Sequence, residues 1–168
     1  MAIARQSLAT AIRSEAGIDV AFQPIFDLDT GWACAYEALV RGLPGESAAS
    51  ILARALTFHA YGFRVALDDF GAGYSGLVTL AQLPTDWVKL DMALIRHIDQ
   101  DGERRMIVAR VVEMLRDLGR EIVAEGVETT GELAAVRALG ISKVQGFLLG
   151  RPSLTELQAR PYPMVCAA

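Results

Sequence analysis

Five polar residues of the types that bind divalent cations and move protons stand at or near the ends of predicted strands: Glu37, Asp68, Asp69, Lys89 and Glu125. Carboxylate oxygens are the ligands that Mg²⁺ and Mn²⁺ prefer. A lysine beside such acids can orient a water or stabilise phosphoryl charge. A further carboxylate can act as general base on a metal-bound water. These residue types predict an oxygen-ligated cation site.

The segment from Asp68 to Gly76 is the densest motif, and it allows more than one interpretation. Gly71, Gly73 and Gly76 have the G-x-G-x-x-G spacing of a dinucleotide site, but two carboxylates directly before the first glycine would repel a pyrophosphate. Alternatively, the glycines permit a sharp turn through which both aspartates reach one cation. Asp69 alone is equally compatible with a role as cap of the following helix.

Lys89 and Glu128 each allow two interpretations. Lys89 lies between apolar residues at a strand end, so it is either a snorkelling surface residue or a charge directed into the site. The neighbouring carboxylates favour the site. Glu128 either braces the loop after a strand or caps the helix that starts near Thr130.

The elements that must position these residues alternate between strands and helices. Two apolar runs, 21–28 and 32–40, flank Asp29-Thr30-Gly31 and predict an antiparallel hairpin. A helix is predicted over 47–61. The later strands are predicted at 64–69, 87–91, 121–125 and 143–145, and the later helices at 76–82, 92–98, 103–118, 130–139 and from Ser153. This order predicts a mostly parallel sheet whose carboxyl-terminal rim holds the site.

Composition narrows the class of protein. The chain has 168 residues, 52% of them apolar, and a net charge of −4 without a basic block, which argues against a nucleic-acid polymer as partner. Two separated cysteines and two histidines make a zinc site improbable and indicate a cytoplasmic protein. No membrane span is expected. We expect one domain over 1–168, with an N-terminal helix at 1–17, a barrel core at 18–160 and a tail at 161–168.

Six short motifs occur in one order along most of the chain: Gln23-Pro24-Ile25, Glu37-Ala38-Leu39-Val40-Arg41, Asp68-Asp69-Phe70-Gly71-Ala72-Gly73-Tyr74, Lys89-Leu90-Asp91, Glu125-Gly126-Val127-Glu128 and Gln145-Gly146-Phe147. Together they resemble the EAL domain family of bacterial cyclic di-GMP phosphodiesterases. The resemblance implies a (β/α)₈ barrel with one antiparallel strand, and Mg²⁺ or Mn²⁺ as cofactor.

The resemblance also implies roles for individual residues. Glu37, Asp68 and Asp69 would bind metal, Lys89 would orient the water, and Glu125 would be the base. Gln23, Arg41 and Gln145 would hold the substrate. Glu128 would steady a loop near the contact between the subunits of a homodimer.

The chain departs from the family between Arg41 and Arg64. Only 31 positions separate Glu37 from Asp68, where family members carry two further strands with a metal-binding asparagine and glutamate. The sequence contains no asparagine at all. The expected fold is therefore α/β, a shortened TIM-like (β/α) barrel with about six strands and an antiparallel first strand. The six strands could close, leave an open sheet, or pair with a second chain. We expect a closed or nearly closed barrel with some self-association.

Three functions follow from this departure. The favoured expectation is a degenerate EAL-type domain that binds cyclic di-GMP or a protein partner with impaired hydrolysis, because two-metal cleavage needs both ions in place. The alternatives are an active Mg²⁺- or Mn²⁺-dependent phosphodiesterase that produces linear pGpG, and a structural fragment without a ligand.

Overall fold

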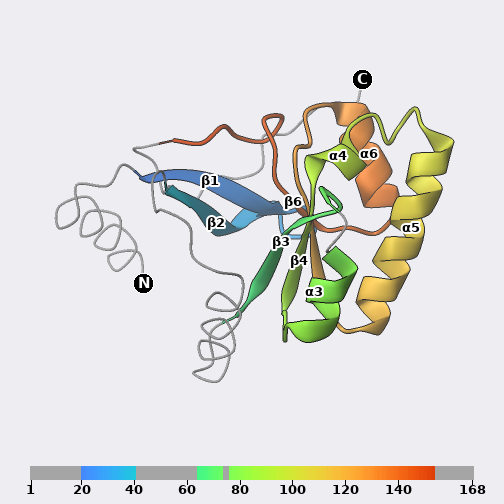
Figure 1. The fold of residues 1–168 in the computed structure, drawn as a ribbon. Coiled ribbons are helices and arrows are strands. Elements are labelled where there is room, and N and C mark those ends of the chain that lie inside the picture. Colours follow the sequence, from blue (N-terminus) through green and yellow to red (C-terminus); the bar gives the residue numbers. More distant parts are fainter. Residues whose placement is uncertain (1–19, 41–63, 74–75, 154–168) are drawn as a thin grey trace.

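A single six-stranded sheet organises the part of the chain that the computed structural model describes, residues 20–40, 64–73 and 76–153. Helices α3, α5 and α6 lie together on one side of the curled sheet, and α4 lies near its rim (Figure 1). The strands are β1 (Val20–Asp27), β2 (Trp32–Val40), β3 (Ala66–Phe70), β4 (Trp87–Leu90), β5 (Glu121–Ala124) and β6 (Lys143–Val144). The helices are α3 (Gly76–Gln82), α4 (Met92–Ile95), α5 (Gly102–Asp117) and α6 (Thr130–Ala138).

The strand order is β2-β1-β6-β5-β4-β3. Strands β3, β4, β5 and β6 pair in parallel, whereas β1 is antiparallel to both of its neighbours, β2 and β6. The predicted hairpin and the antiparallel first strand are therefore confirmed. The carboxyl ends of β2 to β6 point to the same rim, because β2 reverses the direction of β1.

Local chemistry explains the turn of the hairpin. Asp27 Oδ1 accepts hydrogen bonds from the backbone N–H groups of Asp29 (2.9 Å) and Thr30 (3.2 Å). Gly31 then takes a φ of 73°, a conformation that costs glycine little. The turn residues that the sequence indicated thus close the hairpin and set the register that places Gln23 opposite Glu37.

Side-chain caps fix where the helices begin. The Asp91 side chain accepts a hydrogen bond from the backbone N–H of Ala93 at the start of α4, and Asp101 accepts one from Arg104 at the start of α5. Helix α6 begins with a capping box between Thr129 and Glu132. These caps satisfy N–H groups that have no partner within a helix, and they hold the helix starts close to the rim.

The core lies between the sheet and the helices. Strand β4 is buried over Val88, Lys89 and Leu90, as expected for a parallel strand covered on both faces. Helix α5 contributes buried apolar side chains such as Val108 and Leu115. Lys89 is the only charged residue in this otherwise apolar strand, and its burial is explained by its contacts in the functional site.

The two edges of the sheet are β2 and β3, and they do not pair with each other in the described residues. The expected closed barrel is thus not observed in that part of the chain, although the sheet is strongly curled (Figure 1). The reason is geometric: closing a barrel fixes strand number, tilt and stagger together.

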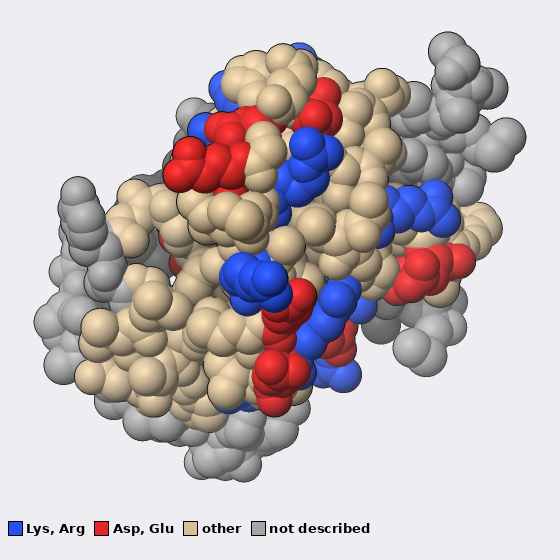
Figure 2. Space-filling view, turned by 90° about the vertical axis from the view of Figure 1, so that its right-hand side faces the viewer, with Lys and Arg blue, Asp and Glu red and all other residues tan. Residues whose placement is uncertain are grey.

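Several expectations lie outside the described residues: the N-terminal helix at 1–17, the helix over 47–61, all but the first residue of the helix from Ser153, and the tail at 161–168. On the helical face in Figure 2, positive and negative side chains are interspersed without a large patch of either sign. Among the described residues, no helix has the length and apolar character that crossing a membrane requires.

Candidate active site

A pocket of about 370 Å³ opens at the carboxyl-terminal rim of the sheet. This is the rim where ligands bind in α/β folds, and the volume is in the usual range for ligand pockets. The lining residues come from strands β1 to β4 and from the segments after β4, β5 and β6: Gln23, Glu37, Asp68, Asp69, Lys89, Asp91, Met92, Glu125, Gly126, Glu128, Gln145, Gly146 and Phe147.

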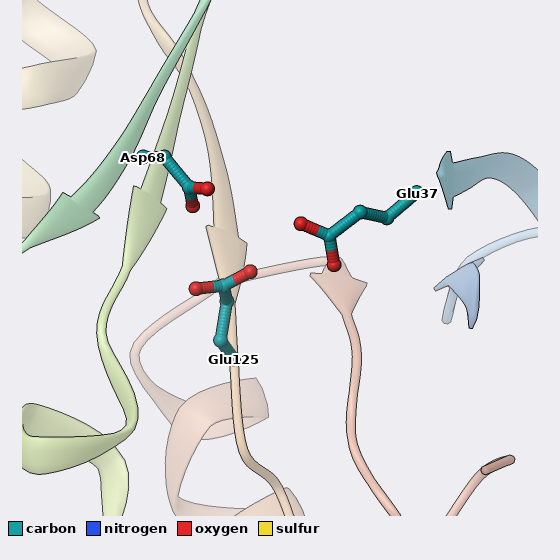
Figure 3. A group of neighbouring side chains, drawn as sticks. All are labelled: Glu37, Asp68 and Glu125. Atoms are coloured by element: carbon teal, nitrogen blue, oxygen red, sulfur yellow. The ribbon is translucent and has the colours of Figure 1, made fainter. Parts of the chain in front are cut away.

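Three carboxylates converge in the pocket. Glu37 comes from β2, Asp68 from β3, and Glu125 from the residue after β5 (Figure 3). One oxygen of each lies within 4.8 Å of the others. We call Glu37, Asp68 and Glu125 the carboxylate cluster. Residues separated by 88 positions meet here because parallel strands end at a common rim.

The Lys89 ammonium lies among the three carboxylates. Its Nζ is 2.8 Å from Glu37 Oε1, 2.9 Å from Asp68 Oδ1 and 2.6 Å from Glu125 Oε1. Only 7% of the Lys89 side chain is exposed. The lysine therefore points into the site, and the snorkelling interpretation is wrong.

Burial and charge perturb both titrating partners. Burial raises the pKa of Glu125 to about 7; the Lys89 ammonium opposes this rise, and the charges of Asp68 and Glu37 add to it. Burial acts to lower the pKa of Lys89, but its hydrogen bonds to Glu125, Glu37 and Asp68 raise it above its ordinary value. Lys89 therefore stays charged at neutral pH, whereas Glu125 can both accept and release a proton there.

Two glutamines extend the polar network from the cluster. Gln145 Nε2 donates to Glu37 Oε2 at 2.6 Å and to Gln23 Oε1 at 2.9 Å. Gln23 Nε2 in turn donates to the Gly150 carbonyl at 3.2 Å. Gln145 Oε1 is buried, and none of the residues that the structure describes donates a hydrogen bond to it. Because an unpaired buried oxygen is costly, this acceptor is suited to a donor group on a ligand.

The structure separates the two adjacent aspartates. Asp68 belongs to the carboxylate cluster, whereas Asp69 lines the pocket without joining it. Asp69 has a φ of 53° and Gly71 one of 106°, and Ala72 N donates to Asp69 O at 3.1 Å. The chain thus turns sharply after Asp68, as the glycines predicted, and this turn directs consecutive side chains apart.

Glu128 also lines the pocket and pairs with Arg96 at 2.7 Å. It does not cap α6, since the Thr129 side chain accepts the hydrogen bond from the Glu132 N–H there. The structure thus favours the first interpretation of Glu128, a brace of its loop. Arg41 lies outside the described residues.

Sequence reasoning missed the residue that anchors this loop, Glu132. The residue is 2% exposed, and its carboxylate accepts hydrogen bonds from the N–H groups of His97 (3.0 Å), Glu128 (2.9 Å) and Thr129 (3.0 Å). The T-x-x-E pattern from Thr129 to Glu132 is the sequence feature that could have identified it. Asp91 and Phe147 line the pocket as well, without an assigned role in the sequence analysis.

The donor set fits one hard divalent ion. The three carboxylates supply oxygen ligands of the kind that Mg²⁺ and Mn²⁺ use. Among the described residues, no second group of three such ligands accompanies them. The residues that would hold the ion are thus Glu37, Asp68 and Glu125.

Comparisons with known proteins agree with the fold. MucR of Pseudomonas aeruginosa, a bifunctional diguanylate cyclase/cyclic di-GMP phosphodiesterase, is 42% identical over 97 residues, which cover 58% of this chain and 14% of MucR. The chain thus spans about a seventh of that relative's length.

Two solved structures share the fold. A standalone EAL protein from Vibrio cholerae, solved with c-di-GMP bound, superposes with a TM-score of 0.71 and 27% identity, covering 81% of this chain and 92% of that one. BlrP1 of Klebsiella pneumoniae, solved as a manganese/cyclic di-GMP complex, superposes with a TM-score of 0.65 and 26% identity. The match covers 83% of this chain and 57% of BlrP1. The sequence model of the EAL domain matches residues 43–152. This chain therefore belongs to the EAL domain family.

Proposed function

We propose that this domain binds cyclic di-GMP at the carboxylate cluster with the help of a divalent ion and hydrolyses it poorly. The observation that carries the proposal is the convergence of Glu37, Asp68 and Glu125 around Lys89 at the mouth of one pocket. The similarity to relatives named for cyclic di-GMP chemistry supports the choice of ligand.

The charge of the pocket supports a role for the ion. Within the described part of the chain, one lysine lines it together with six acidic residues: Glu37, Asp68, Asp69, Asp91, Glu125 and Glu128. A phosphodiester brought among these carboxylates would be repelled. A divalent ion would offset this repulsion and, when bound, would polarise the phosphate and lower the pKa of water. Binding should therefore depend on the ion more than on direct contacts with the protein.

The domain's own residues have separate tasks in this proposal. Glu125 has two carboxylate oxygens: one would hold the ion, and the other accepts a proton from the attacking water. The Lys89 ammonium stabilises developing negative charge. The unpaired Oε1 of Gln145 accepts a hydrogen bond from the ligand. Asp69 and Glu128 shape the rim beside them.

Poor hydrolysis follows from the shortened chain. The usual two-metal mechanism stabilises both the attacking and the leaving oxygen, and the described cluster supplies ligands for one ion. The proposal keeps an active phosphodiesterase as second candidate, because Lys89 and Glu125 are in contact and the pKa of Glu125 suits a base. The homodimer and the protein partner remain predictions.

The test is a calorimetric titration of cyclic di-GMP with Mn²⁺ and with chelator, beside chromatography of the products. We expect binding with Mn²⁺, its loss in chelator and in Glu37→Gln, and unchanged binding in Glu113→Gln, a control on the exposed face of α5. Turnover should be more than about 100-fold below that of a complete EAL phosphodiesterase. Turnover at the full rate would favour the second candidate, and no binding under either condition would refute both.

A further inference from the structure

We propose that the Lys89 ammonium occupies the cation position of the carboxylate cluster, so that a divalent ion enters this site only by displacing it. The proposal rests on the proposed function solely for the kind of ion. It concerns metal entry, which can be measured without cyclic di-GMP.

The first support is the position of Nζ. It lies 2.6–2.9 Å from one oxygen of each cluster member, and the three carboxylates have oxygens within 4.8 Å of one another. Mg²⁺ and Ca²⁺ hold carboxylate oxygens at about 2.0–2.6 Å. The Lys89 ammonium and an ion bound by all three acids would therefore compete for the same small volume. Two cations at so short a distance repel each other strongly.

The second support is the engagement of the remaining oxygens. Both oxygens of Glu37 accept a hydrogen bond, Oε1 from Lys89 and Oε2 from Gln145. Asp68 Oδ1 accepts from both Lys89 and the Asp69 N–H. An ion that takes Glu37 as ligand must therefore share an oxygen with at least one of these N–H donors, and at Glu37 Oε1 that donor is the Lys89 ammonium.

The third support is the freedom of the lysine side chain. Its Cα is fixed in the central strand β4 between Val88 and Leu90, both fully buried, whereas its stem of four carbons is flexible. Lys89 also lines the pocket, so the ammonium has an adjacent space into which it can move. The strand itself need not shift when an ion enters.

The consequence runs against the usual effect of substitutions in a metal site. Removing Lys89 should increase the affinity for the ion, because the ion no longer has to displace a cation from its ligands. In the intact domain without metal, the Lys89 ammonium holds the carboxylates together. The concentration of the free divalent ion sets the fraction of domains in which the ion has replaced the ammonium.

The chain offers an internal control for testing this exchange, since its only lysines are Lys89 and Lys143. Lys143 pairs with Glu121 at 2.7 Å and its side chain is 18% exposed, so it too is partly buried and paired with a carboxylate. In a lysine-selective carbon-13 NMR titration with Mg²⁺, we expect the Lys89 Cε resonance to shift and the Lys143 resonance to stay. A Lys89 resonance that remains unchanged to the highest Mg²⁺ concentration would overturn the proposal.

The second experiment measures Mn²⁺ affinity by electron paramagnetic resonance at pH 8, above the pKa of Glu125. Lys89→Met should bind Mn²⁺ about 10–100-fold more tightly than the wild type, the usual range for changes around metal ligands. Lys143→Met and the charge-conserving Lys89→Arg should show no such gain. Equal or weaker binding by Lys89→Met would overturn the proposal, and should that variant not fold, the NMR titration decides alone.

Both experiments separate this proposal from the proposed function. A domain that exchanges Lys89 for Mg²⁺ but ignores cyclic di-GMP would support the displacement and refute the function. A domain that binds cyclic di-GMP while the Lys89 resonance stays unchanged would support the function and refute the displacement.

Discussion

Glu132 holds two loops of the rim together, and replacing it should destabilise the domain more than replacing any exposed acid. The Glu132→Ala substitution removes an acceptor that is 2% exposed and binds three backbone N–H groups. His97, whose φ is 60°, donates to Oε1, and Glu128 and Thr129 donate to Oε2. The loss therefore releases the segment after β4 and the segment after β5 together.

The magnitude follows from these three hydrogen bonds. A buried donor left without a partner costs about 1–3 kcal/mol. Water can reach part of the released loop, so we expect Glu132→Ala to lower the free energy of unfolding by about 3–5 kcal/mol in total. Glu132→Gln keeps one acceptor oxygen and should cost about 1.5–3 kcal/mol.

The pH dependence gives a second, independent check. Burial acts to raise the pKa of Glu132, but the hydrogen bonds from His97, Glu128 and Thr129 outweigh it and lower the pKa below its ordinary value. A lowered pKa in the folded state contributes stability above the unfolded value of about 4.3, and this contribution is lost as the pH falls further. The difference between wild type and Glu132→Gln should thus be full at pH 7 and shrink below about pH 4.

Urea unfolding followed by circular dichroism measures both effects. The matched control is Glu103→Ala, which removes an exposed acid from the first turn of α5 and should cost no more than about 1 kcal/mol. If Glu132→Ala proves no more destabilising than Glu103→Ala, or if its cost is the same at pH 3 and pH 7, the account of this anchor is refuted.

Two further substitutions test the same rim. Gly146→Ala should lower the free energy of unfolding by about 1–3 kcal/mol and weaken ligand binding, because an added Cβ would overlap the Val127 backbone. The control is Gly102→Ala, whose added Cβ would meet no atom within 4 Å. Equal stability of the two variants would contradict the prediction. Arg104→Ala should cost about 1–3 kcal/mol, since Nη1 binds the carbonyls of Ala93 (2.8 Å) and Arg96 (2.6 Å) at the end of α4. Both costs are measurable by thermal unfolding.

The sequence predicted the elements that position the site because their patterns are local. The alternation of short apolar runs with helical periodicity predicted β3 to β6 and the helices between them within one to three residues of their observed ends. Polar residues at strand ends predicted a common rim, since parallel strands must finish there. Glu37, Asp68, Lys89 and Glu125 therefore came together as expected.

Features that depend on three-dimensional geometry escaped prediction. The sequence placed Asp68 and Asp69 equally near a cation, and only the left-handed backbone at Asp69 separates them. It brought Lys89 to the site without indicating that one ammonium would contact all three carboxylates. Glu132 went unnoticed because its role depends on donors as far along the chain as His97. Closure of the sheet likewise depends on how β2 and β3 are spaced, which no local pattern specifies.

The most direct test of the central claim is a crystal structure of the domain with Mn²⁺ and cyclic di-GMP, with manganese located by its anomalous scattering. We predict a single ion held by Glu37, Asp68 and Glu125, with the Lys89 ammonium moved out of the cluster. Two fully coordinated manganese ions within one copy of the chain, or one ion beside an unmoved Lys89, would contradict the account.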